Sequence, residues 1–350
     1  MSHDLTILMS VYNGGKYLSE SIHSMLNQTF SDFEFIIIDD ASTDSSRDII
    51  HSYNDPRIKL IKNEKHIGQA QSLNKGLVKA KGNYIARMDQ DDISLPMRLE
   101  CQLNVMEKNK NIGVCGTFAL FIDNNGEIIN LKYPEKLMTK NQDLKPQLLF
   151  KPCFIHPTVV IRLSLLKNHH IIFEKGGGHA QDYLMWFRLS SLTDFMNISD
   201  KLLKYRIHDE QLSTSKFNDQ FISSINTRKR IIEKFLEREV SEDEKIKHSR
   251  ISVAQHCSNL TEIDEAENWL QFLMNYNERN KKYETKSLTI VLENIWILLC
   301  MNSSHLGVML LLKYFTSPLR YFKFANIYKE FKLILKCLIR YKVTLPIYKL

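Results

Sequence analysis

Hydrophobic and polar residues follow two different rhythms along the first ninety positions. Short continuous apolar runs are separated by segments in which apolar residues recur every three or four positions. The runs predict strands and the segments between them predict helices, at 5–11, 33–38, 58–61 and 84–88, and at 17–29, 42–52 and 73–80 respectively. Ser42 or Thr43 is the expected N-cap of the second helix. This alternation is typical of an α/β fold, in which helices cover both faces of a parallel sheet.

Acidic residues follow two of these strands. Asp39 and Asp40 end the second strand, and Asp89, Asp91 and Asp92 follow the fourth. Since parallel sheets bind ligands at the carboxyl ends of their strands, we expect both clusters to share one cleft. Several carboxylates at one strand end are costly unless a cation neutralises them, and Mg²⁺ or Mn²⁺ commonly bridges carboxylates to phosphates. The second cluster is therefore either a metal–diphosphate site or a solvated acidic turn.

The pattern changes near residue 216. Glycine becomes rare, and long helical patterns follow at 227–240 and 264–276. We therefore expect two domains, 1–215 and a helical region at 216–350. Residues 287–315 are strongly apolar, but charged and polar residues interrupt them, so a transmembrane helix is the less favoured interpretation.

Charge and cysteine content refine this division. The net charge is +7, yet residues 313–350 carry nine Lys or Arg and one acid, so residues 1–312 sum to about −1. The six cysteines are widely spaced, without a Cys-x-x-Cys pair, which favours reduced, mostly buried thiols over zinc or disulfides. The N-terminus has no signal-peptide pattern. We expect a cytoplasmic protein with no nucleic-acid partner.

The tail at 313–350 interleaves its cations with aromatic and aliphatic residues. Basic amphipathic helices of this kind lie in anionic membrane interfaces, which predicts a peripheral protein at the inner face of the membrane. The alternative is that the tail packs on the protein or forms an oligomer contact.

Five blocks resemble the nucleotide-binding half of family 2 glycosyltransferases, in the order and spacing of that family. The blocks are Thr6–Asn13, Ser24–Phe30, Ile37–Asp44, Asn63–Gly76 and Gly82–Asp92. The resemblance implies the GT-A fold with a mixed, mainly parallel sheet, a nucleoside-diphosphate sugar donor that is often UDP-linked, and inversion at the anomeric carbon. It also implies a bacterial enzyme of surface-polysaccharide synthesis, with a glycan or lipid-linked oligosaccharide as acceptor.

The resemblance also implies roles for individual residues. Asp91 and His208 are expected to bind the metal, Mn²⁺ or Mg²⁺. His208 lies in a segment that resembles the family's Tyr-Arg-x-His sequence. Residues expected to bind the nucleotide or the donor sugar are Ser10, Tyr12, Asp39, Asp40, Asn63, Arg87, Asp89, Asp92 and Arg206. In the first acidic cluster, helix capping is the alternative explanation.

A general base is expected in the acceptor half. Residues 178–189 resemble the family's Glu-Asp block, in which the proton-abstracting carboxylate matches Asp182. Gln181 stands where the family usually has Glu, which puts in doubt the support that the neighbouring acid gives. Without the resemblance, Asp182 would be the N-cap of a helix at 183–192.

The sequence therefore predicts an inverting glycosyltransferase. A donor-binding protein without transfer activity is the alternative from another class. A dehydrogenase or a P-loop enzyme is disfavoured, because the first turn, residues 12–16, matches neither Gly-x-Gly-x-x-Gly nor the P-loop pattern.

Overall fold

The computed structural model describes residues 4–129, 138–174, 180–208, 211, 217–320 and 327–341, with side chains from 222 onward in the segment that begins at 217. The chain divides into two compact units. The first comprises Met1–Leu144 and Pro152–Ser223, and the second comprises Lys145–Lys151 and Ser224–Leu350. The boundary that the sequence pattern places at 215 lies outside the described residues.

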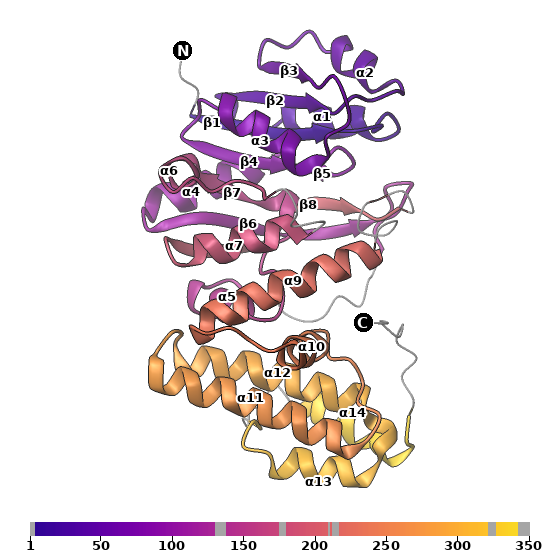
Figure 1. The fold of residues 1–350 in the computed structure, drawn as a ribbon. Helices are drawn as coiled ribbons and strands as arrows, with labels where there is room; N and C mark the ends of the chain where they lie inside the picture. Colours follow the sequence, from indigo (N-terminus) through magenta and orange to yellow (C-terminus); the bar gives the residue numbers. More distant parts are fainter. Residues whose placement is uncertain are drawn as a thin grey trace. The chain divides into compact units, whose positions relative to one another are not determined.

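The first unit is built around one mixed sheet of eight strands in the order β3-β2-β1-β4-β7-β6-β8-β5 (Figure 1). Strands β1 to β4 are mutually parallel, and so are β6 and β8, whereas β7 and β5 run antiparallel to their neighbours. The strands are β1 (Leu5–Val11), β2 (Phe33–Asp39), β3 (Ile58–Lys62), β4 (Tyr84–Met88), β5 (Ile93–Ser94), β6 (Ile112–Ile122), β7 (Val160–Arg162) and β8 (Asp194–Arg206). This is the expected α/β architecture of the GT-A type.

The first three helices connect the parallel strands β1 to β4, and four more of the described helices lie between the later strands. They are α1 (Leu18–Leu26), α2 (Ser46–Ser52), α3 (Gln69–Lys79), α4 (Arg98–Lys108), α5 (Asn141–Gln147), α6 (Leu163–Asn168) and α7 (Gln181–Ser190). Every residue of β1, β2 and β4 is buried, which explains why these strands appear in the sequence as mainly apolar runs. The parallel strands β1, β2 and β4 therefore end at one edge, where Asp40 and Asp89 follow β2 and β4.

The start of α2 differs from the prediction. The helix begins at Ser46, and its N-cap is Ser45 rather than Ser42 or Thr43. The backbone N–H groups of Ser42 and Thr43 donate instead to Asp39 (3.0 Å) and to the Asn13 side chain (2.9 Å). Side-chain acceptors from other segments thus hold residues 42–45 as a loop beside the first turn of the chain.

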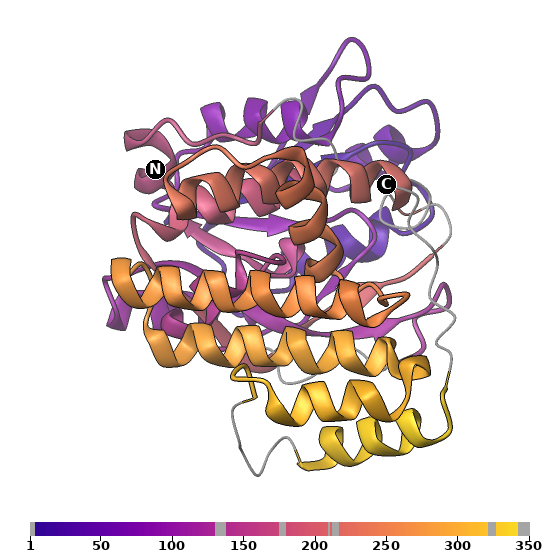
Figure 2. The ribbon, with the colours of Figure 1, turned by 60° about the horizontal axis from the view of Figure 1, so that its bottom comes forward.

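The second unit is helical. Its helices are α9 (Phe217–Leu236, which starts in the first unit), α10 (Glu242–Ser252), α11 (Leu260–Asn280), α12 (Thr285–Asn302), α13 (Val308–Thr316) and α14 (Ile327–Leu338). Helix α11 packs against α12, and α12 packs against both α13 and α14 (Figure 2). Helices α13 and α14 also pack against each other. Among the helices that the structure describes, none has both the length and the apolar character that a membrane crossing requires.

Gly82 allows the closest backbone approach in the first unit. A Cβ at this position lies 2.6 Å from the carbonyl carbon of Leu5 and 2.6 Å from the nitrogen of Thr6. Because both neighbours are backbone atoms of a central strand, they cannot move aside as a flexible side chain does. We expect Gly82→Ala to lower the free energy of unfolding by about 1–3 kcal/mol, measured by urea unfolding. The exposed neighbour Lys81 provides the control, and Lys81→Ala should change stability by less than about 0.5 kcal/mol.

Candidate functional site

Asp89 follows β4 directly and is held from two sides. The guanidinium of Arg87, which is buried, forms an ion pair with its carboxylate, and Gln69 Nε2 donates to its Oδ1 at 3.2 Å. Burial raises the pKa of Asp89 and the charge of Asp91 acts in the same direction, while Arg87 opposes both. Arg87, which we expected to bind the donor, therefore holds the Asp89 carboxylate at the strand end.

Asp91 and His208 meet although 117 positions separate them in the sequence. Asp91 Oδ2 lies 2.9 Å from His208 Nε2, and the two side chains are only 14% and 11% exposed. His208 lies two residues beyond the end of β8, and the antiparallel pairing of β8 with β5 brings it beside the acidic turn. The two residues predicted to bind a metal are thus adjacent.

Arg206 fastens the acidic turn to β8. Its backbone N–H donates to Asp92 Oδ1 and its Nε to the carbonyl of Asp91, both at 2.9 Å. Its remaining nitrogens reach the carbonyl of Asp123 at 3.1 Å and the carboxylate of Glu20. Since the guanidinium is 2% exposed and bonded to the protein, its direct contact with a diphosphate stays a prediction.

Asp92 is the most buried acid of the turn, at 1% exposure. Its Oδ2 has no hydrogen-bond partner among the residues that the structure describes. Burial raises the pKa of Asp92 well above its ordinary value, and the charges of Asp91 and Asp89 add to this. Asp92 therefore holds the turn to β8 as an internal acceptor for the Arg206 N–H, and its predicted contact with the donor sugar stays a prediction.

Asp40 is buried in a ring of donors rather than facing the solvent. Its oxygens accept from Asn63 Nδ2 (2.8 Å), the N–H of Ile67 (3.0 Å) and the N–H of Gly68 (2.8 Å). Burial alone raises its pKa, but these hydrogen bonds outweigh it and lower the pKa below the ordinary value. Asp40 and Asn63 thus shape the loop that precedes α3.

The other predicted donor residues line the ends of β1 and β2. Asp39 is fully buried, accepts from the N–H of Ser42 and forms an ion pair with Arg47. Ser10 is buried near the end of β1, whereas Tyr12, just beyond it, is 42% exposed. Tyr12 therefore provides an accessible aromatic ring at this strand end.

Two residues outside the predicted set complete this edge. The side-chain amide of Gln90 bonds both backbone groups of Tyr12, at 2.8 and 3.2 Å. The His66 ring lies against the Tyr12 ring, with centroids 3.9 Å apart, and its Nδ1 is 2.9 Å from Asp40 Oδ2. Gln90 and His66 both lie inside the blocks that carry the family resemblance, but no chemical pattern in those blocks distinguishes them.

Asp182 occupies the second position of α7. The N-cap of this helix is Ala180 and no side chain caps it, so the N-cap interpretation of Asp182 is wrong. Burial raises the pKa of Asp182 to about 6; the N–H groups of Tyr183 and of Asp182 itself oppose this, and the charge of Asp89 favours it. A carboxylate with this pKa ionises near neutrality, which suits a general base.

A chain of side-chain amides joins this helix to the acidic turn. Gln181 Nε2 donates to Gln69 Oε1 at 3.0 Å, and Gln69 Nε2 donates to Asp89 Oδ1 at 3.2 Å. Gln181 is buried, and it is the residue next to Asp182. The position where the family usually has Glu thus carries an amide that links the predicted donor side to the predicted base.

Aromatic rings surround the other side of α7. Trp186 of α7 contacts Phe154 and His156, with centroids 5.4 and 6.0 Å apart, and His156 contacts Phe173 at 5.6 Å. Burial lowers the pKa of His156 well below its ordinary value, and the charge of Arg87 adds to this. His156 is therefore a neutral imidazole, and its Nε2 has no partner within the described part of the chain.

The residues of the acidic turn fit a divalent cation that a substrate shares. The described residues contain no cluster of three His, Cys, Asp or Glu that alone could hold a metal. One carboxylate and one imidazole, as in Asp91 and His208, leave several positions for diphosphate oxygens and water. Because imidazole favours transition metals, this pair suits Mn²⁺ better than Mg²⁺.

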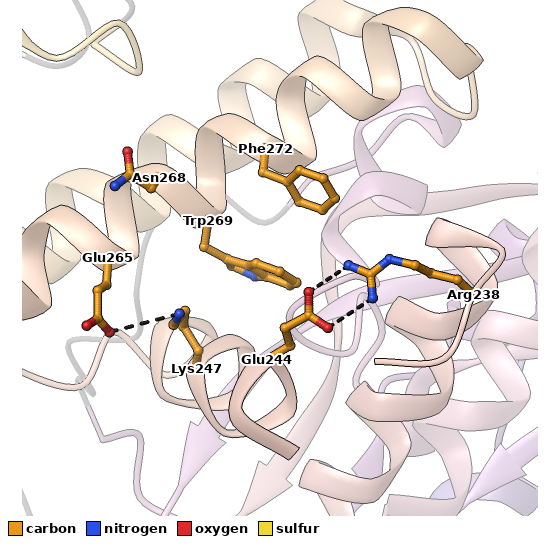
Figure 3. Close-up of a pocket in the computed structure, with 7 residues that line it drawn as sticks. All are labelled: Arg238, Glu244, Lys247, Glu265, Asn268, Trp269 and Phe272. Carbon is orange, nitrogen blue, oxygen red and sulfur yellow. Dashed lines mark hydrogen bonds and ion pairs between the residues drawn. The ribbon is translucent and has the colours of Figure 1, made fainter. Parts of the chain in front are cut away.

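A separate pocket of about 300 Å³ lies between α10 and α11 in the helical unit (Figure 3). Its charged side chains are paired: Arg238 bonds both carboxylate oxygens of Glu244, and Lys247 lies 3.9 Å from Glu265. Glu244 also completes the capping box of α10. The charged residues that line the pocket therefore stabilise the helical unit through ion pairs and a helix cap. None of the predicted site residues lines this pocket.

Comparison with known proteins identifies glycosyltransferases as relatives of this chain. The model of the family described as glycosyl transferase family 2 matches residues 6–168. The UDP-Glc:alpha-D-GlcNAc-diphosphoundecaprenol beta-1,3-glucosyltransferase WfgD of Escherichia coli is 33% identical over 218 residues, which cover 61% of this chain and 81% of WfgD.

Two solved structures have a similar fold at low identity. Residues 1–349 of S. aureus TarS, in complex with UDP-GlcNAc, match with a TM-score of 0.55 and 18% identity, over 95% of this chain and 91% of that one. The mannosyltransferase PcManGT of Pyrobaculum calidifontis, in complex with GDP-Man and Mn²⁺, matches with a TM-score of 0.52 and 13% identity, over 97% and 88%.

Proposed function

The chain belongs to glycosyl transferase family 2, and from this premise we propose that it is an inverting enzyme with Asp182 as its general base. As a glycosyltransferase it moves a sugar from a nucleotide sugar to an acceptor. The observation that carries the proposal is the amide chain from Asp89 through Gln69 to Gln181. It supports one cleft with the donor on the acidic turn and the acceptor hydroxyl at α7.

On the donor side, we assign recognition of the nucleotide to the ends of β1, β2 and β4. Tyr12 is 42% exposed, and a nucleobase can stack on the face of its ring that His66 does not cover. Asp39, Asp40 and Asn63 shape the wall beside it through their buried hydrogen bonds. The nucleotide we propose is UDP, because WfgD, which shares the family, is named for a UDP-linked donor.

Asp91 and His208 would hold the metal at the diphosphate. A bound Mn²⁺ or Mg²⁺ supplies positive charge that stabilises the departing diphosphate. Arg87 and Arg206 support the acidic turn from the protein interior. Arg87 is buried and pairs with the Asp89 carboxylate, and Arg206 is buried and bonds Asp92 and the carbonyl of Asp91. They keep the carboxylates in place before the donor arrives, which is what electrostatic preorganisation requires.

On the acceptor side, Asp182 takes the proton of the attacking hydroxyl. The oxygen then forms a bond to the anomeric carbon as the bond to the diphosphate breaks, and the proton stays on the Asp182 carboxyl group. A pKa of about 6 leaves this group mainly ionised at pH 7, ready to accept the proton. The neutral His156 packs against Phe173 and against Trp186, which lies one turn after Asp182 on α7.

We propose a glycan or lipid-linked oligosaccharide as acceptor, since WfgD is named for an acceptor on diphosphoundecaprenol. Such an acceptor places the enzyme at the cytoplasmic face of a membrane as a peripheral protein. Purified enzyme given UDP-glucose, UDP-GlcNAc or GDP-mannose, with and without Mn²⁺, should release nucleotide faster when an acceptor is added. Donor binding without any acceptor-dependent release would support the alternative of a non-catalytic donor-binding protein.

Gln181→Glu tests the amide chain. A second carboxylate beside Asp182 raises the pKa of the base by roughly one unit, and Gln69 can no longer donate to Asp89 while accepting from residue 181. We expect the acidic limb of the pH–rate profile to move upward from about 6 and turnover at pH 7 to fall. Gln69→Leu removes the link without adding charge, so it should lower turnover and leave the limb in place. Equal profiles for all three proteins would contradict a positioning role.

A further inference from the structure

Exposed apolar side chains gather at the end of the described chain. Twenty large hydrophobic side chains are exposed among the described residues, and eleven of them lie between Val308 and Tyr341. Nine are spread over all the preceding positions. Single exposed apolar residues are ordinary, but a gathering of this kind marks a surface that contacts something else.

Helix α14 presents three faces instead of the usual two. One is buried against the helical unit and comprises Glu330, Leu333 and Cys337. The second is exposed and apolar and comprises Ile327, Tyr328, Phe331, Leu335, Leu338 and, just past the helix, Ile339. The third is a basic row formed by Lys332, Lys336 and Arg340, whereas Lys329 on the same side donates to Asn294 Oδ1 at 3.1 Å. At 100° per residue the basic row borders the exposed apolar face.

Helix α13 also has an exposed apolar face. It buries Leu310, Leu311 and Tyr314, and it exposes Val308, Met309, Leu312 and Phe315. The helix packs beside α14, and the two form the yellow edge of the helical unit (Figures 1 and 2). The buried faces are joined by a hydrogen bond from the Tyr314 hydroxyl to Glu330 Oε1 at 3.1 Å. Both helices thus bury one face and leave a second apolar face outward.

The charge of this surface is positive. Its acid, Glu330, is 9% exposed and paired with Arg320, with Nε at 2.8 Å from Oε1. Lys332, Lys336 and Arg340 form no ion pair with any acidic residue in the described part of the chain. Lys332 and Arg340 are exposed, and Lys336 is half-buried with its ammonium 5.0 Å from the centroid of the Tyr341 ring. Lys332 and Arg340 are therefore the cations most accessible to an anionic partner.

We propose that the exposed face of α13 and α14 docks on an anionic phospholipid bilayer. The apolar side chains enter the boundary between headgroups and acyl chains, about 5–10 Å deep, while the basic row contacts phosphate groups. A second copy of the chain on the same face would bring two basic rows together, which disfavours a self-contact. This surface rests on the proposed function in one respect: it would hold the enzyme where a lipid-linked acceptor is found.

Sedimentation of the full chain with vesicles tests the surface. The protein should bind vesicles that mix phosphatidylglycerol with phosphatidylcholine, bind pure phosphatidylcholine much more weakly, and be released by high salt. Lys332→Gln with Lys336→Gln should weaken binding about 25-fold, since each cation near a charged surface contributes about fivefold. Lys281→Gln with Lys286→Gln, which makes the same change elsewhere in the unit, should leave binding unchanged.

Acidic substitutions test the apolar face. Phe331→Asp and Leu335→Asp replace side chains that are 58% and 47% exposed, so the fold should tolerate them. Each should weaken vesicle binding at least about tenfold. Ile246→Asp is the matched control, because Ile246 is 41% exposed on α10 and lies apart from this face. Circular dichroism should give all three variants the wild-type helix content.

The outcomes separate the two proposals. Equal binding of wild type and the face variants, or no binding to anionic vesicles, would overturn the docking surface. A wild-type dimer in sedimentation equilibrium that Leu335→Asp converts to a monomer, without vesicle binding, would also overturn it and assign the face to a second copy. Nucleotide release with a water-soluble acceptor does not depend on this face. If the wild-type protein binds anionic vesicles but releases no nucleotide when given donor and acceptor, the result would contradict the proposed function and leave the docking surface standing.

Discussion

Asp182→Asn should lower the turnover number for sugar transfer on the order of 10²–10⁴-fold. Asparagine keeps the size of the side chain but cannot accept the proton of the acceptor hydroxyl. The Michaelis constant for the donor should change little, because in the proposed arrangement the donor binds at the acidic turn and the acceptor hydroxyl at α7. Acceptor-dependent nucleotide release measures turnover, and calorimetry with UDP measures donor-site binding.

The pH dependence gives a second measure of the same residue. The pKa of Asp182 is raised to about 6, so the protonated, inactive form accumulates as the pH falls through 6. Wild-type kcat should therefore decline on the acidic side with a midpoint near 6, and this limb should vanish in the residual activity of Asp182→Asn. Asp243→Asn, an exposed acid on α10, is the control. Near-full transfer by Asp182→Asn with intact UDP binding would assign the base to another residue.

Asp91→Asn should cost on the order of 10²–10³-fold in transfer, because a metal at a developing diphosphate contributes several kcal/mol. The amide is a poorer ligand for Mn²⁺ and carries no negative charge. Electron paramagnetic resonance should show weaker Mn²⁺ binding in the presence of UDP, which is a readout independent of turnover. His208→Ala should show the same change to a smaller degree.

Asp48→Asn is the matched control for Asp91→Asn, since it removes the same charge from an exposed position in α2. Removing metal from the wild type with a chelator should reproduce the loss, and adding Mn²⁺ should restore it. Unchanged Mn²⁺ binding in both Asp91→Asn and His208→Ala would show that the metal site lies elsewhere.

The strands at the centre of the first unit could be predicted from the sequence. Leu5–Val11 and Tyr84–Met88 have the bounds that the apolar runs indicate, because strands covered on both faces bury every side chain. Helix starts were predicted less well. Helix α2 begins at Ser46 because Asn13, thirty positions away from Thr43, provides an acceptor for the backbone in front of the helix.

The family resemblance assigned Asp91 and His208 to one metal site, but the contacts that bring them together could not be predicted from local sequence patterns. Pairing of β8 with β5 and β6 brings Arg206 and His208 to the turn from more than a hundred positions away. No local pattern in the sequence encodes this pairing. Burial then separates the acids: Asp91 remains partly exposed beside His208, whereas Asp92 is enclosed and its pKa is raised.

By itself, the sequence determined the α/β class, the family, the two acidic clusters and the acid expected as base, because these depend on local periodicity and on residue types in a fixed order. Only the tertiary structure decided which of those residues stay exposed and which are buried in contacts with distant parts of the chain. It linked Gln69 to Gln181 and gave α14 a third, outward apolar face. Hydrogen bonding and burial depend on neighbours that are distant in the chain, and the folded sheet and helices bring those neighbours together.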